Sequence, residues 1–399
     1  MTFLAKYRCS GTKASFLCKI TILVGLCFVS TLAFSQIKVG AEQYELYASQ
    51  LEGKKVALIA NQSSLVKDEH LVDFLLSKEV DIVKIFSPEH GFRGTADAGQ
   101  KVHSSRDKKT GLACVSLYGK NKKPSDFQLK GVDVLVFDLQ DVGVRFYTYL
   151  STLHYIMEAA AENQIEVVVL DRPNPNIDRI DGPILEENCS SFIGIHPIPV
   201  LHGMTLGELA KMINNEAWLA NGVKCKLSVV PVKNYTRVSE YTLKVRPSPN
   251  LPNHQSIRLY PSLCFFEGTI VSIGRGTDYP FQVYGHPFLN QVQKFAFTPH
   301  PIEGASNPKL NGKVCYGYDL RDQKVQLGAG LNLSYLIDTY HRYAIKEQFF
   351  NKSFFRLLAG TDELLRQIQS GMSEAEIKRT WQTGLTKFKS DRKPYLLYN

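Results

Sequence analysis

The sequence predicts an α/β protein: a Rossmann-like parallel-sheet domain, then a smaller mixed α/β domain. In the first half of the chain, short segments that are apolar throughout alternate with helical patterns. Strands that are buried on both faces have this composition, and intervening helices allow parallel pairing. The second half is less regular and contains a proline-rich stretch. We therefore expect domains at residues 36–240 and 241–399.

The strands of the first domain are expected where apolar runs end in polar residues. They are residues 54–61, 80–87, 132–141, 165–175 and 197–203. Residues 224–235 form a further possible strand that closes or leaves the domain. The turn after the first strand reads IANQSS rather than G-x-G-x-x-G, so we expect no dinucleotide site.

Helices are expected from apolar periodicity and from capping residues. The segments are residues 68–78 with Asp68 as N-cap, 149–164, 205–216 with a Thr205–Glu208 capping box, 332–344, and 373–388 with a Ser373–Glu376 box. The proline-rich residues 246–268 are predicted to be a loop at the entry to the second domain.

The first 35 residues are predicted to be a signal peptide. A basic region ends at Lys19, the apolar run ITILVGLCFVSTLAF follows, and small residues precede a plausible cleavage point after Ser35. An uncleaved anchor is the alternative. We expect an exported, periplasmic or extracytoplasmic protein with no stable membrane insertion after cleavage.

Charge and cysteine content exclude some functions. The formal net charge is +9, but part of the excess lies in the leader, and no Lys/Arg run of the kind that binds nucleic acid is present. The cysteines beyond the leader are scattered, without C-x-x-C or zinc spacing, and their neighbours indicate core positions. We expect no nucleic-acid partner and no cofactor.

Polar residues gather at the carboxyl ends of the predicted strands, where ligands bind in open parallel sheets. They are Asn61; Glu89 and His90; Asp138 and Asp141, followed by Arg145 and Tyr147; Asp171, Arg172 and Asn174; and His202. Strands that run in parallel bring these ends to one edge. The sequence therefore predicts a functional site along this edge.

Some of these residues also have a structural interpretation. Asp171 can cap the backbone of the following turn, Asp138 and Asp141 can cap the next helix, and His202 can be a hydrogen-bonded core histidine. Glu89 differs, because it lies at a strand end between Pro88 and Gly91. These two residues favour an unusual backbone conformation that keeps the turn close to a bound ligand. We expect Glu89 to be catalytic.

Glycosidic cleavage suits this set of residues. The reaction needs a proton donor and usually a second carboxylate, and sugars bind to aromatic faces and polar donors. VRFYTY and RGTDYPFQVYG supply such groups, whereas G-x-S-x-G and Walker motifs are missing from the sequence. A metal site built from Glu89, Asp138, Asp141 and a histidine remains open, although its spacing is not diagnostic.

Seven ordered motifs resemble the NamZ-type exo-β-N-acetylmuramidases. They are FSPEHGFRG, FDLQDVGVRFYTY, DRPNPN, DGP, HGMTLGELA, SPNLP and GRGTDYPF. The resemblance implies release of N-acetylmuramic acid from the non-reducing end of peptidoglycan fragments, including muropeptides, in a cleft between two domains. It also implies that Glu89 is the leading catalytic residue, with His90 beside it.

The resemblance also marks candidate residues of the cleft. Residues at motif positions are Asp138, Asp141, Arg145, Tyr147, Asp171, Arg172, Asn250, Arg275 and Asp278. Muramic acid carries a lactyl carboxylate, which an arginine can bind through two hydrogen bonds. The candidates for this contact are Arg93, Arg145, Arg172 and Arg275.

Three mechanisms remain open at this point. In the first, Glu89 is the general acid, and an Asp from the third or fourth strand end activates water or stabilises the oxocarbenium ion. The substrate's acetamido group can replace this second carboxylate. Alternatively, the chain is a non-catalytic muropeptide-binding protein, or a metal-dependent hydrolase that uses the strand-end acids.

Overall fold

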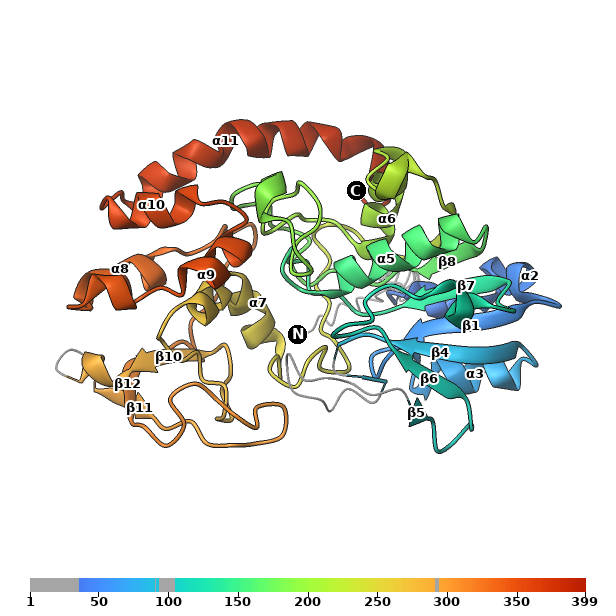
Figure 1. Ribbon diagram of the computed structural model, residues 1–399, viewed down its shortest axis with the longest axis horizontal. Coiled ribbons are helices and arrows are strands. Elements are labelled where there is room, and N and C mark those ends of the chain that lie inside the picture. The colour runs from blue at the N-terminus through green and yellow to red at the C-terminus, as the bar shows by residue number, and fades with distance from the viewer. Residues whose placement is uncertain (1–35, 90, 93–104, 291–293) are drawn as a thin grey trace, which may run out of the picture. The chain divides into compact units, whose positions relative to one another are not determined.

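A computed structural model describes residues 36–89, 91–92, 105–290 and 294–399 (Figure 1). The predicted leader lies outside these ranges, so its cleavage stays a prediction. All helices and strands named below belong to one compact unit, Lys38–Asn399. Within the described residues, no helix is long and apolar enough to cross a membrane.

The N-terminal domain is built on a sheet that, in the described residues, has seven strands in the order β5-β6-β4-β1-β7-β8-β9. Neighbouring strands are parallel, except that β5 is antiparallel to β6. Without the edge strand β5, this is the strand order of doubly wound sheets. Figure 1 shows the labelled strands side by side. Their bounds are β1 Lys55–Ala60, β4 Asp81–Ser87, β5 Ser105–Arg106, β6 Ala113–Ser116, β7 Val134–Asp138, β8 Glu166–Leu170 and β9 Lys226–Val230.

Both faces of this sheet are buried, which explains why its strands are apolar throughout. Successive side chains of β1 alternate between two hydrophobic clusters, with Ile59 in one and Leu58 in the other. Helices cover both faces, and α4 Asp126–Leu129 precedes β7. The cluster with Ile59 includes residues of α5 Tyr149–Glu162 and α6 Leu206–Asn215, and the cluster with Leu58 includes residues of α2 Ala48–Leu51 and α3 Leu71–Ser77.

The predicted N-cap at Asp68 is wrong. The Val72 N–H donates to the His70 side chain, so His70 caps α3. Asp68 lies instead in the tight turn between β2 Leu65–Val66 and β3 Glu69–His70, where its side chain is exposed. A hairpin in front of the helix therefore moves the helix start by two residues.

The prediction of a strand at residues 197–203 is also wrong. In this segment, Leu201 forms isolated bridges with Val144 and Asp181. The segment is apolar because Val200 and its neighbours are buried in the hydrophobic cluster beneath α5 and α6. The position beside β8 is taken by β9, from the segment that was expected to close or leave the domain.

The C-terminal domain is smaller and contains an antiparallel sheet of order β10-β12-β11. The loop predicted for residues 246–268 is wrong in its second half, where α7 forms despite Pro261 because Asn253 and Ser256 make a capping box. The elements of this domain are α7 His254–Leu263, β10 Val283–His286, β11 Phe295–Phe297, β12 Cys315–Asp319, α8 Ser334–Arg342, α9 Lys352–Ala359, α10 Glu363–Gln369 and α11 Glu374–Asp391.

The end of the chain returns to the N-terminal domain. Helix α11 begins at the predicted Ser373–Glu376 capping box and runs from α10 toward α6 (Figure 1). After it, the Tyr398 hydroxyl donates to Asp171 at 2.6 Å, and the Leu397 N–H donates to the Glu208 carboxylate at 2.8 Å. The last residues therefore hold the start of α6, whose Thr205–Glu208 capping box is also confirmed.

The cysteines beyond the leader behave as core residues. All five are buried, as their apolar neighbours indicated. They are Cys114, Cys189, Cys225, Cys264 and Cys315.

Arg145 joins segments that are distant in sequence. It is 1% exposed. Its guanidinium donates to the carbonyls of Pro183 and Ile198, and to those of Leu358 and Ala359 at the end of α9. These bonds satisfy backbone acceptors in a region that water does not reach.

Replacing this side chain should destabilise the fold. Arg145→Met leaves several buried carbonyls without a donor, so we expect the free energy of unfolding to fall by about 3–5 kcal/mol. Urea denaturation measures the change. Arg321→Met is the matched control, because Arg321 pairs with Asp319 near the surface and its loss should cost less than about 1 kcal/mol. Equal losses for both variants would contradict this role.

Candidate active site

A pocket of about 800 Å³ lies beside the carboxyl end of β4. Its lining includes residues of both domains. The first domain contributes Glu89 and residues 146–149, and the second contributes Tyr260 of α7 together with parts of segments 271–275 and 304–309. Pockets that hold small ligands measure roughly 300–1,000 Å³. The space is therefore large enough for a sugar and part of its neighbour.

Glu89 is half-buried in the pocket wall, in the turn after β4. The Thr148 hydroxyl donates to its Oε2 at 2.8 Å, and the Tyr118 side chain is hydrogen-bonded to the same carboxylate. Burial, and secondarily the charge of Glu89, raises the pKa of Tyr118, so this phenol stays protonated. Gly91 has a φ of 76°, which favours glycine in this turn. The local backbone thus places a carboxylate between two hydroxyl partners.

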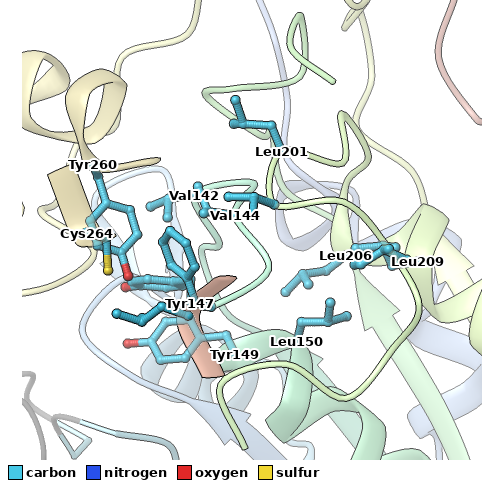
Figure 2. Packing of buried hydrophobic residues seen from close by; sticks show 14 of the residues in the cluster. Val142, Val144, Tyr147, Tyr149, Leu150, Leu201, Leu206, Leu209, Tyr260 and Cys264 are labelled. Atoms are coloured by element: carbon cyan, nitrogen blue, oxygen red, sulfur yellow. The ribbon is translucent and has the colours of Figure 1, made fainter. Parts of the chain in front are cut away.

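Two buried tyrosines connect the sheet to the segment that precedes α7. The Asn61 side chain, at the end of β1, donates to the Tyr149 hydroxyl at 2.8 Å. Tyr147 and Tyr149 in turn donate to the Pro247 carbonyl, at 2.8 and 3.3 Å. In Figure 2 the Tyr147 ring lies beside those of Tyr149 and of Tyr260 in α7, with ring centroids 4.7 and 6.2 Å away. Asn61 therefore supports an aromatic wall of the pocket.

The C-terminal domain supplies a charged wall. Arg275 donates from Nε and Nη2 to Oε1 of Glu267, at 2.8 and 2.5 Å. Lys309 and Asn250 also line the pocket, and the Asn250 amide donates to the Gly304 carbonyl at 2.8 Å. Of these residues, Asn250 and Arg275 were candidates from the sequence. Glu267 was missed, although a single carboxylate in the apolar run SLCFFEG was an available signal.

Two strand-end acids have internal partners instead. Asp138 accepts from Nε and Nη2 of Arg172, at 2.5 and 2.8 Å, and neither residue is part of the described pocket lining. Asp171 accepts from the Thr205 hydroxyl at 2.6 Å and from the Gly207 N–H at 2.8 Å. Burial raises the pKa of Asp171 to about 6. Its contacts correspond to the capping role that was weighed from the sequence.

Asp141 lies behind the aromatic wall. It accepts from the Gly143 N–H at 2.6 Å, while its Oδ1 has no hydrogen-bond partner among the described residues. Burial raises the pKa of Asp141 to about 7. Its charge acts on the phenols of Tyr147 and Tyr149, so this carboxylate is close to the pocket without lining it.

Other candidates lie farther from the pocket lining. The Asn174 amide donates to the Met204 carbonyl, and the Met204 N–H donates to Nδ1 of His202. Burial lowers the pKa of His202 to about 3, which fits a neutral core histidine. Asp278 is exposed. His90 and Arg93 lie outside the described residues. The substrate-binding and catalytic roles of all these residues stay predictions.

The described residues contain no group of three or more His, Cys, Asp and Glu side chains that could hold a metal ion. The carboxylates that formed the hypothetical metal set have separate partners. Asp138 pairs with Arg172, whereas Glu89 binds Thr148.

Comparison with known proteins identifies the family. A model described as exo-β-N-acetylmuramidase NamZ, N-terminal, matches residues 56–255, and its C-terminal counterpart matches residues 258–398. A Bacillus subtilis (strain 168) protein named peptidoglycan β-N-acetylmuramidase NamZ is 39% identical over 380 residues, which cover 88% of this chain and 89% of that protein. The predicted domain boundary at residue 240 stays a prediction.

Two crystal structures of DUF1343 family proteins from Bacteroides fragilis are similar as well. The first is 46% identical, with a TM-score of 0.85, and the match covers 92% of this chain and 99% of that one. The second is 30% identical, with a TM-score of 0.76, and the match covers 91% of this chain and 99% of that one. The likeness therefore extends over both domains.

The matches to the family models and to the Bacillus subtilis relative show that the protein is a glycosidase. The chain belongs to the exo-β-N-acetylmuramidase NamZ family. This confirms the resemblance that the seven motifs indicated.

Asp141 should make stability depend on pH. Its pKa is about 7 in the folded protein and about 3.9 in an unfolded chain. The folded state therefore binds this proton more tightly, and the stabilisation, complete below about pH 4, is lost as pH rises through 7. Asp141→Asn removes this dependence and keeps an acceptor for Gly143. Between pH 4.5 and 8, we expect the free energy of unfolding of wild type to fall by about 2–4 kcal/mol relative to that of the variant.

Urea denaturation at both pH values measures this difference. Asp278→Asn is the control, because Asp278 is exposed, and its unfolding curves should stay parallel to wild type. A pH-independent difference between wild type and Asp141→Asn would contradict the assignment.

Proposed function

We propose that this protein releases N-acetylmuramic acid from the non-reducing end of peptidoglycan fragments, and that Glu89 is the general acid. The observation that carries the proposal is the position of Glu89, half-buried in the wall of a sugar-sized pocket and held by Thr148. The name of the Bacillus subtilis relative supports the choice of peptidoglycan.

In the proposed reaction, Glu89 protonates the glycosidic oxygen as its bond to the anomeric carbon breaks, and water adds to that carbon and returns a proton to the enzyme. A general acid must lie within hydrogen-bond reach of that oxygen, so its side chain has to be fixed. Thr148 and Tyr118 provide this support from two directions. An Asp from the third or fourth strand end (Asp138, Asp141 or Asp171) was expected to activate water or to stabilise the oxocarbenium ion. Arg172 occupies Asp138 and the start of α6 occupies Asp171, so the proposal gives these two acids no part in the reaction.

We further propose that the first domain is Rossmann-like and that the active site occupies a cleft between the two domains. The strand order supports the first point, and a pocket lining drawn from both domains supports the second. Aromatic side chains on one wall and polar groups on the other suit the two faces of a pyranose ring. A pocket, rather than an open groove, suits the removal of terminal sugars.

Export is part of the proposal. Residues 1–35 carry basic residues and then an apolar core, and peptidoglycan lies outside the cytoplasm. We infer a periplasmic or other extracytoplasmic location. N-terminal sequencing of protein isolated from cells tests this, with Gln36 as the expected first residue; an intact leader would contradict cleavage.

Glu89→Gln should show the signature of a lost general acid. On a disaccharide of N-acetylmuramic acid and N-acetylglucosamine, kcat should fall by about 10²–10⁴-fold. On 4-nitrophenyl β-N-acetylmuramide the loss should be smaller, because nitrophenolate leaves without a proton. Mass spectrometry and absorbance measure the two reactions. Near-normal activity, or equal losses on both substrates, would contradict this assignment.

Two further variants control the experiment. Glu52→Gln changes an exposed carboxylate and should leave both rates unchanged. Thr148→Val removes a donor to Glu89 but no helix cap, because the Thr148 side chain makes no capping bond. It should lower kcat about tenfold with little change in KM, and Thr148→Ser should restore the rate. Binding of the disaccharide without turnover by wild type would favour a receptor instead.

A further inference from the structure

The charged wall of the pocket offers an arginine to a ligand. Of the arginines expected to bind a carboxylate, Arg275 is part of the described lining, whereas Arg145 and Arg172 bind internal acceptors. Its side chain is 24% exposed and lines the pocket. The described structure thus reduces the predicted set to this residue, with Arg93 outside the described ranges.

The contact with Glu267 uses one side of the guanidinium. Oε1 of Glu267 accepts from Nε and Nη2 of Arg275. Glu267 does not use the two Nη1 N–H groups or the second Nη2 N–H. These donors lie at the end of the guanidinium, where one N–H from each nitrogen can bind the two oxygens of a carboxylate. No other acceptor binds this guanidinium within the described part of the chain. A second anion can therefore bind without displacing Glu267.

The guanidinium is also held in place before a ligand arrives. It lies over the Phe281 ring, 5.2 Å from the ring centroid, and Oε2 of Glu267 accepts from the Cys264 thiol at 3.7 Å. A fixed fork loses little side-chain entropy when it binds. Arg275 is therefore preorganised on the side that faces away from Glu267.

Lys309 leaves this wall with a net positive charge. Its ammonium donates to the carbonyls of Phe266 and Thr269, on either side of Glu267. Burial lowers the pKa of Lys309 to about 8, so most of its charge remains at neutral pH. The negative charge of Glu267 offsets only one of the two positive charges of Arg275 and Lys309, so this wall keeps a net charge of about +1.

We propose that Arg275, fixed by Glu267 and supported by the charge of Lys309, binds the lactyl carboxylate of N-acetylmuramic acid and makes the enzyme specific for this acidic sugar. This inference rests on the proposed function and adds the residue that selects the substrate. A sugar without the lactyl group, such as N-acetylglucosamine, leaves the fork without its anion. The peptide-linked form, in which the carboxylate is an amide, loses the same contact.

The test pairs two substrates that differ only in charge. They are 4-nitrophenyl β-N-acetylmuramide and its lactyl methyl ester. Wild type should prefer the acid in kcat/KM by about ten- to hundredfold, which corresponds to charge-assisted hydrogen bonds. Arg275→Gln should lose this preference, because its kcat/KM falls about ten- to hundredfold more on the acid than on the ester.

Further variants separate binding from folding. Arg275→Lys keeps the charge but not the fork, so the preference should fall only in part. Glu267→Gln weakens the anchor and should also act mainly on the acid. Arg321→Gln is the matched control, because Arg321 also pairs with a carboxylate of the second domain but is not part of the described pocket lining. It should keep the wild-type preference.

Equal losses on acid and ester in Arg275→Gln and Arg275→Lys would overturn the inference, because a structural role affects both substrates alike. An absence of preference in wild type would overturn it too. If wild type hydrolyses neither glycoside, the proposed function fails. Calorimetry then decides the inference by itself, because Arg275→Gln must lose at least tenfold in affinity for free N-acetylmuramic acid and not for its methyl ester.

Discussion

The parallel alignment of β4, β1 and β7 is the constraint on which the site depends. Because these neighbours run in one direction, their carboxyl ends bring Asn61, Glu89 and Asp138 to the same edge of the sheet. The edge does not act as one row of catalytic groups. Glu89 faces the pocket, Asn61 supports Tyr149, and Asp138 is bound to a buried arginine.

The carboxylates at this edge of the sheet differ in their hydrogen-bond partners. Burying an ionised carboxylate is costly unless donors or a cation compensate for it. Arg172 does so for Asp138, and the start of α6 does so for Asp171. The hydroxyls of Thr148 and Tyr118 bind Glu89, whose side chain lines the pocket. One strand edge therefore holds structural acids and a candidate catalytic acid.

Sequence patterns identified some residues of the candidate site, on both of its walls, but not all of them. Glu89 and Tyr147 were found because they follow predicted strands, and Asn250 and Arg275 because they lie in family motifs. Glu267 and Lys309 belong to segments without a strand-end position or a diagnostic spacing. They reach the pocket because the second domain packs against the first, which no local pattern encodes. The short strand β6 was missed for the related reason that four residues carry little periodicity.

The sequence by itself determined the parallel sheet, the main helices and the family, because burial on two faces, capping boxes and ordered motifs are local properties of the chain. The tertiary structure decided which polar residues face the pocket. It also decided that residues 197–203 lie outside the sheet, because an apolar segment can be buried beneath helices as well as between strands. Arg145 and Arg275 both stand in family motifs, yet they have different partners in the fold. Carbonyls from segments distant in the chain surround Arg145, whereas Arg275 pairs with Glu267 and keeps donors for a ligand.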